Sequence, residues 1–347
     1  MKHLQVGMSI VNRRCIVLLT IIMDFDEREE IRDGFVVTER RKKVWRCELD
    51  LLQRLLDVCN KYNLRCWVDS GTLLGAVRHE GFIPWDDDID VVMMRDDYDK
   101  LMKIGPQEFL HPIFFQSAYT DKNYFRGHVQ IRNSETTAIL PNEYDRLFNQ
   151  GIFIDVFPLD ALPKDEEKVE KLEKEASCRK YMMKNYQRLD LLSKKIVKNV
   201  YIWLKTKRAI ERTGFKQYYQ EYENLFRAES VENVELVTKI SSIKTWYKGI
   251  DKHYFDETEW MNFESIKVPV PGRYDDYLRL MYGDDYMVPR KVPTVHGSVI
   301  FDTEHGYKDV LPMVKKDYGK FFKLKNKLRK WLHISVSPRK SDRLCEL

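Results

Sequence analysis

The chain has 347 residues, of which 43% are hydrophobic and 33% are charged. A chain of this length and apolar content buries a sizeable core, so global disorder is excluded, and two domains or one large domain with insertions are expected. The 59 lysines and arginines exceed the 54 aspartates and glutamates only slightly, which excludes a broad nucleic-acid-binding surface. Any basic contact surface must therefore be local.

The cysteines and the N-terminal residues bear on the compartment. The six cysteines form no Cys-X-X-Cys pair, which argues against a disulfide scaffold and a zinc knuckle and favours a reducing cytoplasm. The longest apolar run, Cys15 to Met23, is shorter than the ~20 residues of a membrane span and lacks the cleavage site of a signal peptide. We therefore expect residues 1–38 to be a loose N-terminal segment, with Met23 as an alternative start.

The first half of the chain alternates predicted helices and strands. Apolar residues at spacings of three, four and seven predict a helix from Glu39 to Tyr62. Apolar runs and turn residues then predict a strand at Leu64–Val68, a helical turn at Leu73–Val77, a strand at Asp88–Met93, a hairpin of Val129–Ile131 with Thr137–Leu140, and a strand at Gly151–Phe157 that Pro158 ends. Residues 39–160 are thus expected to form a compact α/β core.

The second half of the chain is more strongly charged. Three acidic residues after Pro163 suit a helix N-terminus, and a lysine-rich region follows to about Ser230, so residues 161–235 are predicted to be a charged helical insertion. Residues 236–312 are expected to return to the core and complete it. Residues 313–347 are expected to form a basic amphipathic helix and tail.

The densest chemical signal is the string Pro84-Trp85-Asp86-Asp87-Asp88-Ile89-Asp90-Val91. On a strand, side chains alternate, so Asp86, Asp88 and Asp90 would share one face and Asp87 would lie on the other. Carboxylates that converge at this spacing form an oxygen-rich site for a hard divalent cation such as Mg²⁺, with Mn²⁺ as an alternative. A solvated acidic turn is the other interpretation, and the apolar residues that follow weigh against it.

Two further features belong with the acidic string. Asp155 stands in an otherwise apolar run, where burial of a carboxylate is costly unless it is paired or bound to metal, so we expect a third ligand there. Upstream, Gly71 and Thr72 join a strand to a helix, and backbone amides at a helix N-terminus favour phosphate. A Gly-Thr turn, an Asp-hydrophobic-Asp strand and a later strand with one aspartate, in this order, describe the nucleotidyltransferase fold.

The longer string from Gly71 to Asp90 closely resembles the LicD family of bacterial phosphocholine transferases, which is related to the fukutin-type proteins. The resemblance covers most of residues 31–290 and includes Ile31-Arg32-Asp33-Gly34-Phe35, Lys43-Val44-Trp45, Ile131-Arg132-Asn133, Ile154-Asp155-Val156-Phe157-Pro158-Leu159-Asp160 and Tyr282-Gly283-Asp284. Ser70 departs from the pattern, because a second glycine is expected there, and the residues before Met23 have no recognised counterpart. The resemblance implies an α/β (α+β) protein: a nucleotidyltransferase-fold core with a small mixed sheet, a helical insertion and a helical C-terminal region.

The resemblance also implies an activity. Members of the family typically transfer phosphocholine from CDP-choline, or a related group from another CDP-alcohol, to a hydroxyl of a cell-surface glycan such as lipopolysaccharide, teichoic acid or capsule. In this chain Asp88 and Asp90, with Asp86 and Asp155, would then bind Mg²⁺ on the donor's diphosphate. Asp155 would complete the metal shell or accept the proton of the attacking sugar hydroxyl.

The expected phosphate-binding residues are Gly71, Thr72, Arg78 and Arg132. Gly71 and Thr72 would contact phosphate oxygens through backbone and hydroxyl donors, and the two arginines would add further phosphate contacts. The glycan acceptor is expected at residues 236–312 and in the helical insertion.

Two other functions are compatible with the motifs. A metal-dependent glycosyltransferase also uses Asp-X-Asp on a nucleotide diphosphate, but no long nucleotide-binding βαβ series precedes the motif, and Gly71, Thr72 and Asp155 would be unexplained. The second alternative is an inactive glycan-binding relative, against which the complete set of aspartates speaks.

A basic amphipathic helix is predicted from Lys315 to His333. Its apolar stripe comprises Phe321, Leu324, Leu328 and Trp331, and eight lysines and arginines accompany it. Such a helix either lies on an anionic membrane surface or docks on the protein's own core, and we favour the membrane, because a lipid-linked glycan is a suitable acceptor for this family. The expected location is the cytoplasm, peripheral to the inner face of the membrane.

Overall fold

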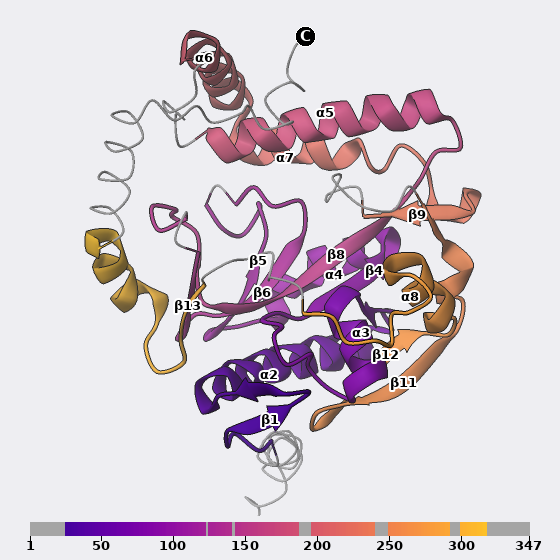
Figure 1. Ribbon diagram of the computed structural model, residues 1–347. Coiled ribbons are helices and arrows are strands. Elements are labelled where there is room, and N and C mark those ends of the chain that lie inside the picture. The colour runs from indigo at the N-terminus through magenta and orange to yellow at the C-terminus, as the bar shows by residue number, and fades with distance from the viewer. Residues whose placement is uncertain are drawn as a thin grey trace, which may run out of the picture.

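The computed structural model describes residues 25–122, 124–140, 143–186, 196–239, 249–291 and 299–317 (Figure 1). Within these residues the protein is a mixed α/β structure built around one central sheet. Of the predicted loose segment of residues 1–38, residues 1–24 lie outside the described residues, whereas Glu30–Arg32 and Phe35–Val37 pair as a hairpin, so this part is not loose. The predicted basic helix lies outside the described residues from residue 318 onward. None of the helices in the described part combines the length and the apolar run that a membrane span needs.

Helix α2 (Glu39–Tyr62) is the longest helix in the described part of the chain and confirms the first prediction. It begins at Thr38, whose side chain accepts a hydrogen bond from the backbone N–H of Arg41 at 3.3 Å, and it ends at Asn63 in the left-handed conformation. Its apolar stripe, which includes Trp45, Leu49 and Leu52, is fully buried against the sheet. The helix therefore covers one face of the central sheet.

The central sheet brings together strands that are far apart in sequence. Its described strands are β3 (Trp67–Val68), β4 (Asp90–Met94), β5 (Ile113–Gln116), β6 (Val129–Asn133), β8 (Ile152–Ala161), β9 (Leu236–Thr238) and β10 (Ile250–Asp251). Strands β4 and β8 are parallel, and the other pairs are antiparallel, so the sheet is mixed. Both β6 and β9 pair with the edge of β8 opposite β4, at different levels along this long strand.

Two strand predictions were wrong in detail. The predicted hairpin does not form: β6 pairs with β5 and β8, whereas β7 (Thr137–Ile139) pairs with β13 (Ile300–Asp302), because partners distant in sequence cover the apolar faces better than the neighbour does. Pro158 does not end β8, which continues to Ala161. Backbone N–H groups point to alternate edges of a strand, and the N–H of Asp155 points toward β4. The nitrogen of Pro158 therefore faces the other edge of β8, in the gap between the residues that pair with β6 and those that pair with β9. No ladder hydrogen bond is needed there, so proline is tolerated.

Smaller elements surround the sheet. These are the hairpin of β1 (Glu30–Arg32) and β2 (Phe35–Val37), α3 (Ser70–His79), α4 (Arg95–Glu108), the hairpin of β11 (Thr258–Phe263) and β12 (Ile266–Pro271), and α8 (Tyr274–Tyr282). Short 3₁₀ turns lie at Val231–Asn233 and Lys252–Phe255, and residues 307–317 are helical. The segment after residue 236 thus adds strands to the central sheet and a hairpin beside it, as the sequence predicts.

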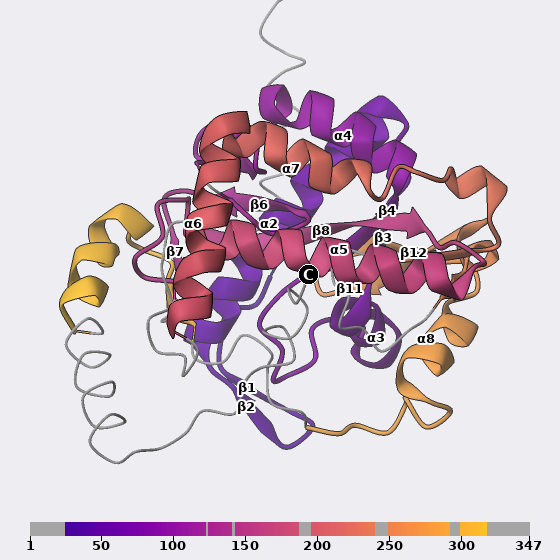
Figure 2. The same ribbon diagram turned by 90° about the horizontal axis from the view of Figure 1, so that it is seen from above.

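The charged region after Pro163 is helical, as predicted. It contains α5 (Glu166–Asn185), α6 (Ile196–Thr213) and α7 (Phe215–Asn224), which form a layer on the side of the sheet opposite α2 (Figure 1). Seen from above, α5 crosses over β8 and β4 (Figure 2). The helices share a second hydrophobic cluster with residues 118–148, in which Tyr124, Phe148, Tyr219 and Tyr222 are almost completely buried. This packing holds α5 over one face of the sheet.

Candidate metal and phosphate site

The register between β4 and β8 brings three aspartates together. Asp90 is paired directly with Asp155 in the parallel ladder, and the N–H of Asp155 donates to the carbonyl of Ile89 at 2.9 Å. Paired residues of neighbouring strands point to the same face of a sheet, so the two carboxylates lie side by side. One oxygen each from Asp88, Asp90 and Asp155 lies within 4.8 Å of the others. This is the arrangement that the sequence predicts for a divalent cation.

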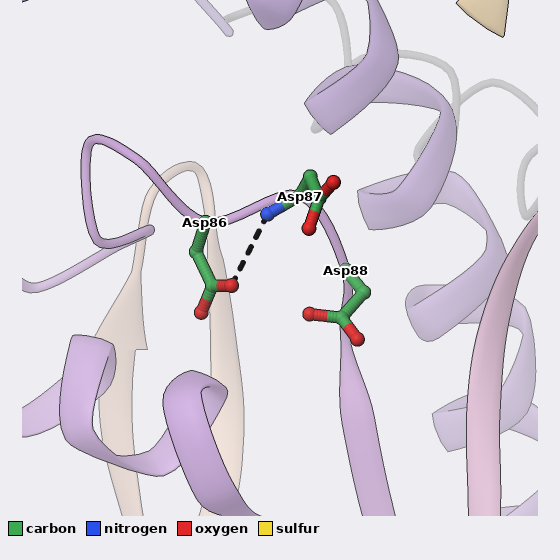
Figure 3. A group of neighbouring side chains, drawn as sticks. All are labelled: Asp86, Asp87 and Asp88. Carbon is green, nitrogen blue, oxygen red and sulfur yellow. Dashed lines mark hydrogen bonds between the residues drawn. The ribbon is translucent and has the colours of Figure 1, made fainter. Parts of the chain in front are cut away.

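The turn before β4 adds a second acidic group, made of Asp86, Asp87 and Asp88 (Figure 3). The Oδ1 atom of Asp86 accepts a hydrogen bond from the N–H of Asp87 at 3.2 Å, and one oxygen from each of the three side chains lies within 4.8 Å of the others. The prediction that Asp87 faces away from Asp86 and Asp88 was wrong. The strand begins only at Asp90, so the alternation of a strand does not apply to the turn.

Mutual repulsion among the carboxylates makes this edge of the sheet a candidate cation site. Burial, followed by the charge of Asp155, raises the pKa of Asp90 to about 7. Burial, followed by the charges of Asp90 and Asp86, raises the pKa of Asp88 well above its usual value. A divalent cation would remove this repulsion, and a donor set made only of carboxylate oxygens suits Mg²⁺ or Mn²⁺. The residues present therefore fit the predicted metal.

The N-terminus of α3 lies against the acidic turn. A Cβ at Gly71 would overlap with Asp86 Oδ2, so a larger residue would force the Asp86 carboxylate to move from its place beside the helix. The hydroxyl of Thr72 accepts a hydrogen bond from the N–H of Asp90 at 2.9 Å. Ser70 has a φ of 50°, a conformation that glycine adopts readily, which explains why a glycine is expected at this position. The structure thus places both predicted phosphate-binding residues next to the aspartates.

A neighbouring aspartate, Asp69, has a different environment. It is fully buried and accepts hydrogen bonds from the hydroxyls of Tyr277 at 2.7 Å and Ser70 at 3.0 Å, and it forms an ion pair with Lys239. Although burial opposes it, the charge of Lys239 keeps the pKa of Asp69 below its usual value. Asp69 therefore anchors the strand–helix turn and is neutralised by the fold itself.

His128 is a site residue that the sequence analysis missed. Its Nε2 atom lies 3.1 Å from Asp155 Oδ1, and its ring packs on Phe157 with centroids 4.3 Å apart. Burial lowers the pKa of His128, so the ring is neutral and its Nε2–H donates to the carboxylate. His128 therefore orients Asp155. A lone histidine without a neighbouring motif gives no signal of this role in the sequence.

Glu48 is a second residue that the sequence analysis missed. It projects from α2 and is almost completely buried, and its Oε2 atom has no hydrogen-bond partner among the described residues. Burial, followed by the charges of Asp87 and Asp86, raises the pKa of Glu48 well above its usual value. Glu48 thus adds a further carboxyl group beside the acidic turn. It stands within a helical pattern, where a charged residue is ordinarily taken for a solvated one.

The two predicted phosphate-binding arginines form hydrogen bonds outside the acidic cluster, although the charges of Arg132 and Asp155 interact. Arg132 is buried inside the sheet, where it donates to the side chains of Gln116 and Gln130 and to the carbonyl of Gly151 at 2.5–2.6 Å. Arg78 is half-buried and donates to the carbonyl of Tyr286 at 3.0 Å, beyond the end of α8. These contacts tie strands and helices together, and the structure does not bring either arginine to the aspartates through a contact.

The insertion presents basic residues to the same region. Lys180 of α5 lies between Ala176 and Met183 on the inward-facing stripe of the helix, and both of these neighbours are buried. Burial, followed by the positive charges of Arg126 and Lys184, lowers the pKa of Lys180 to about 8, and the charge of Asp155 acts in the opposite direction. A positive group therefore faces the sheet from α5, near enough to Asp155 for their charges to interact.

Comparison with known proteins identifies relatives of this arrangement. Residues 63–187 match the family model described as "LicD/FKTN/FKRP, nucleotidyltransferase domain". The lipopolysaccharide cholinephosphotransferase LicD of Haemophilus influenzae is 25% identical over 250 residues, which cover 70% of this chain and 89% of that protein.

Two further relatives match over shorter stretches. An uncharacterized protein of Rickettsia prowazekii is 41% identical over 71 residues, which cover 20% of this chain and 27% of that protein. An uncharacterized protein of Rickettsia typhi is 46% identical over 57 residues, which cover 16% of this chain and 18% of that protein. The matched family domain includes the acidic turn, Asp155 and His128. The chain therefore carries a LicD-family nucleotidyltransferase domain over residues 63–187.

Proposed function

We propose that this protein transfers a phosphocholine-type group from a CDP-alcohol, most simply CDP-choline, to a hydroxyl of a cell-surface glycan. The observation that carries the proposal is the convergence of Asp88, Asp90 and Asp155, on paired strands of a LicD-family domain, beside the N-terminus of α3. The relative from Haemophilus influenzae, a lipopolysaccharide cholinephosphotransferase, supports the choice of donor and acceptor.

In this proposal Asp88, Asp90 and Asp155 hold a Mg²⁺ ion, for which Mn²⁺ can substitute, and Asp86 lies next to them. When bound, the ion neutralises negative charge on the donor's diphosphate and on the leaving nucleoside monophosphate. Thr72 accepts the N–H of Asp90, which leaves its own hydroxyl hydrogen free to donate to a phosphate oxygen. Gly71 keeps the backbone of the helix N-terminus open to the same phosphate.

Asp155 and His128 act together on the acceptor side. The neutral imidazole donates a hydrogen bond to Asp155 Oδ1. This hydrogen bond fixes the orientation of the carboxylate and therefore also the position of Oδ2. Asp155 then serves as a metal ligand or accepts the proton of the attacking sugar hydroxyl. Lys180 lies across from it on α5 and would balance the charge of the donor's phosphates.

The proposed acceptor is a glycan of the cell envelope, such as lipopolysaccharide or teichoic acid, carried on a lipid at the inner face of the membrane. We place the reaction in the cytoplasm, because the cysteine pattern favours a reducing compartment. The predicted basic helix after Lys315 would bring the enzyme to an anionic membrane surface.

A product assay tests the proposal. The purified chain is incubated with Mg²⁺, a glycan acceptor and a panel of CDP-alcohols and nucleotide sugars, and the released nucleotide is identified. Phosphoalkyl transfer releases a nucleoside monophosphate from a CDP-alcohol, whereas glycosyl transfer releases a nucleoside diphosphate from a nucleotide sugar. Release of CMP that is lost with EDTA is the expected result. Release of a nucleoside diphosphate would favour a glycosyltransferase, and no release would favour an inactive glycan-binding relative.

A further inference from the structure

A groove lies on the outside of the molecule, between the second half of α2 and the β11–β12 hairpin. Its volume is about 650 Å³, within the range of small-ligand sites. It is lined by Gln53, Leu56, Asp57, Asn60, Trp260, Asn262, Glu264, Ser265, Ile266 and Lys267. None of these residues belongs to the acidic site, and the proposed function leaves the groove unexplained.

The most unusual residue of the groove is Trp260, which is 58% exposed. Asn262 lies two residues further along β11 and so projects from the same face, and Lys267 of β12 is paired with Asn262 in the ladder. One face of the hairpin therefore presents a flat indole beside an amide and an ammonium group. Tryptophan is enriched at binding interfaces, where its flat apolar ring contacts a ligand while its N–H remains available for a hydrogen bond.

The hairpin that carries Trp260 is firmly attached to the core. The indole N–H of Trp67, in β3, donates to the hydroxyl of Thr258 at 2.9 Å, and Phe263 packs on Phe82 with ring centroids 4.9 Å apart. Residues at both ends of β11 are thus fixed to buried aromatic side chains. The position of Trp260 is held by the fold before any ligand arrives.

The remaining wall of the groove offers hydrogen-bonding groups. Gln53 and Asp57 are joined by a hydrogen bond of 3.1 Å along α2, and Asn60 follows one turn later. The hydroxyl of Ser265 is buried and has no hydrogen-bond partner among the described residues. A buried polar atom of this kind costs free energy unless a ligand or water satisfies it.

The side chains that line the groove are of the kinds that bind sugars. A pyranose ring has C–H groups on one face and hydroxyls around its rim, so it can lie on an indole while its hydroxyls bond to amide, carboxylate and ammonium groups. We propose that the groove binds a sugar unit of the acceptor glycan, an inference that rests on the proposed function. Lys267, Asn262, Gln53 and Asn60 supply the rim contacts.

The groove is separate from the site of transfer. The indole N–H of Trp45, earlier on α2, donates to the carbonyl of Asp86 at 3.3 Å and marks the end of the helix next to the acidic turn. At 1.5 Å per residue, Gln53 and Asn60 lie roughly 12 and 22 Å further along α2. A sugar bound there takes no part in the chemistry. It holds the glycan chain and raises the effective concentration of its other units at the aspartates.

The kinetic test compares Trp260→Ala with Tyr201→Ala, a control that removes another exposed aromatic side chain, on α6. With a polymeric acceptor, such as deacylated lipopolysaccharide or teichoic acid, Trp260→Ala should raise the acceptor KM about tenfold, since effective-concentration gains of this kind are at least that large. The KM for CDP-choline and the kcat should not change. With a monosaccharide acceptor, Trp260→Ala, Tyr201→Ala and the wild type should behave alike. An unchanged KM for the polymer in Trp260→Ala would overturn the inference.

A binding measurement separates this inference from the proposed function. Calorimetric titration of the same polymers into the protein needs neither CDP-choline nor Mg²⁺, so it remains informative if no transfer is detected. Binding by the wild type and by Trp260→Phe, but not by Trp260→Ala of equal melting temperature, supports the groove. Equal binding by wild type and Trp260→Ala, or binding of none of the polymers, overturns it. Binding without transfer would contradict the proposed function and leave the groove supported.

Discussion

Asp155 and Asp160 stand five residues apart on β8 and have opposite surroundings. Asp160 is completely buried, and its Oδ1 atom lies 2.5 Å from Nε of Arg95, at the start of α4. Asp155 lies next to Asp90 and near Asp88, two carboxyl groups whose pKa values are raised by burial and by their acidic neighbours. One carboxylate is balanced by a cation of the fold, and the other is placed among further carboxylates.

This difference separates a structural carboxylate from a functional one. The Asp160–Arg95 pair joins β8 to α4, and each charge has an opposite charge beside it within the fold. The group around Asp155 concentrates negative charge, which is unfavourable for folding and favourable for binding a cation. The same strand therefore carries Asp160, which stabilises the fold, and Asp155, whose acidic surroundings destabilise it.

The largest expected effect is on turnover at the acidic end of β8. Asp90→Asn and Asp155→Asn should each lower kcat by about a thousandfold or more, because each removes an oxygen ligand or a base from the reacting centre. Neither should lower the melting temperature, since loss of a charge relieves repulsion. Rate and melting temperature are measured on the same preparations. Near-normal turnover would remove these residues from the mechanism, and loss of activity in proportion to stability would make them structural.

The next largest effect is on stability at the other end of the strand. Asp160→Asn should lower the free energy of unfolding by about 3 kcal/mol, because it leaves the buried guanidinium of Arg95 with Asp99, at 3.4 Å, as its remaining ion-pair partner among the described residues. Urea denaturation measures this loss, and Arg95→Met combined with Asp160→Asn should restore part of it. If Asp160→Asn is as stable as the wild type, the ion pair with Arg95 does not stabilise the fold, and Asp160 and Asp155 do not differ in the way proposed.

A smaller effect is expected at His128, which orients Asp155. His128→Phe should lower kcat about 10–100-fold, the usual effect of removing a group that holds a ligand in place, and His128→Asn should retain part of the rate. His253 is a suitable control, because it forms ion pairs on the surface with Glu235 and Asp256. A rate for His128→Phe equal to that of His253→Phe would show that Asp155 needs no support from the imidazole.

The smallest expected effect is a dependence of stability on pH and metal. The pKa of Asp90 is raised from 3.8 to about 7, so the folded protein keeps this proton where the unfolded chain has lost it. In the metal-free protein, Asp90 should therefore contribute stability that is fully present below pH ~4 and is lost as the pH rises through ~7. Mg²⁺ should raise the melting temperature by a few degrees at pH 8 and by less at pH 5. An equal shift at both pH values would place the ion elsewhere.

The sequence predicts those parts of the fold whose pattern is local. The periodicity of α2 lies within a single helix, and the order of Gly71, Asp88, Asp90 and Asp155 is visible along the chain, so the helix and the acidic residues could be predicted. The pairing of β7 with β13 could not, because it joins segments more than 150 residues apart in sequence and depends on which apolar faces remain uncovered. Strand alternation also failed for Asp87, which precedes the strand.

Single polar residues were the hardest to predict. His128 and Glu48 carry no motif, and their importance follows only from the side chains that tertiary packing places beside them. Arg132 illustrates the reverse case: it stands in a family-like string, yet the sheet uses its guanidinium for internal hydrogen bonds. Which face of a strand or helix turns toward the site is decided by the whole fold.

The central claim is that Asp88, Asp90 and Asp155 form a divalent-cation site, in contrast to Asp160. Its most direct test is a Mn²⁺ titration followed by electron paramagnetic resonance, with Mg²⁺ as competitor, on wild type, Asp90→Asn, Asp155→Asn and Asp284→Asn. Asp284 is a control, because its side chain is 92% exposed on the surface. The wild type and Asp284→Asn should bind one Mn²⁺ that Mg²⁺ displaces, and the other two variants should lose it. Unchanged binding by Asp90→Asn and Asp155→Asn would contradict the account.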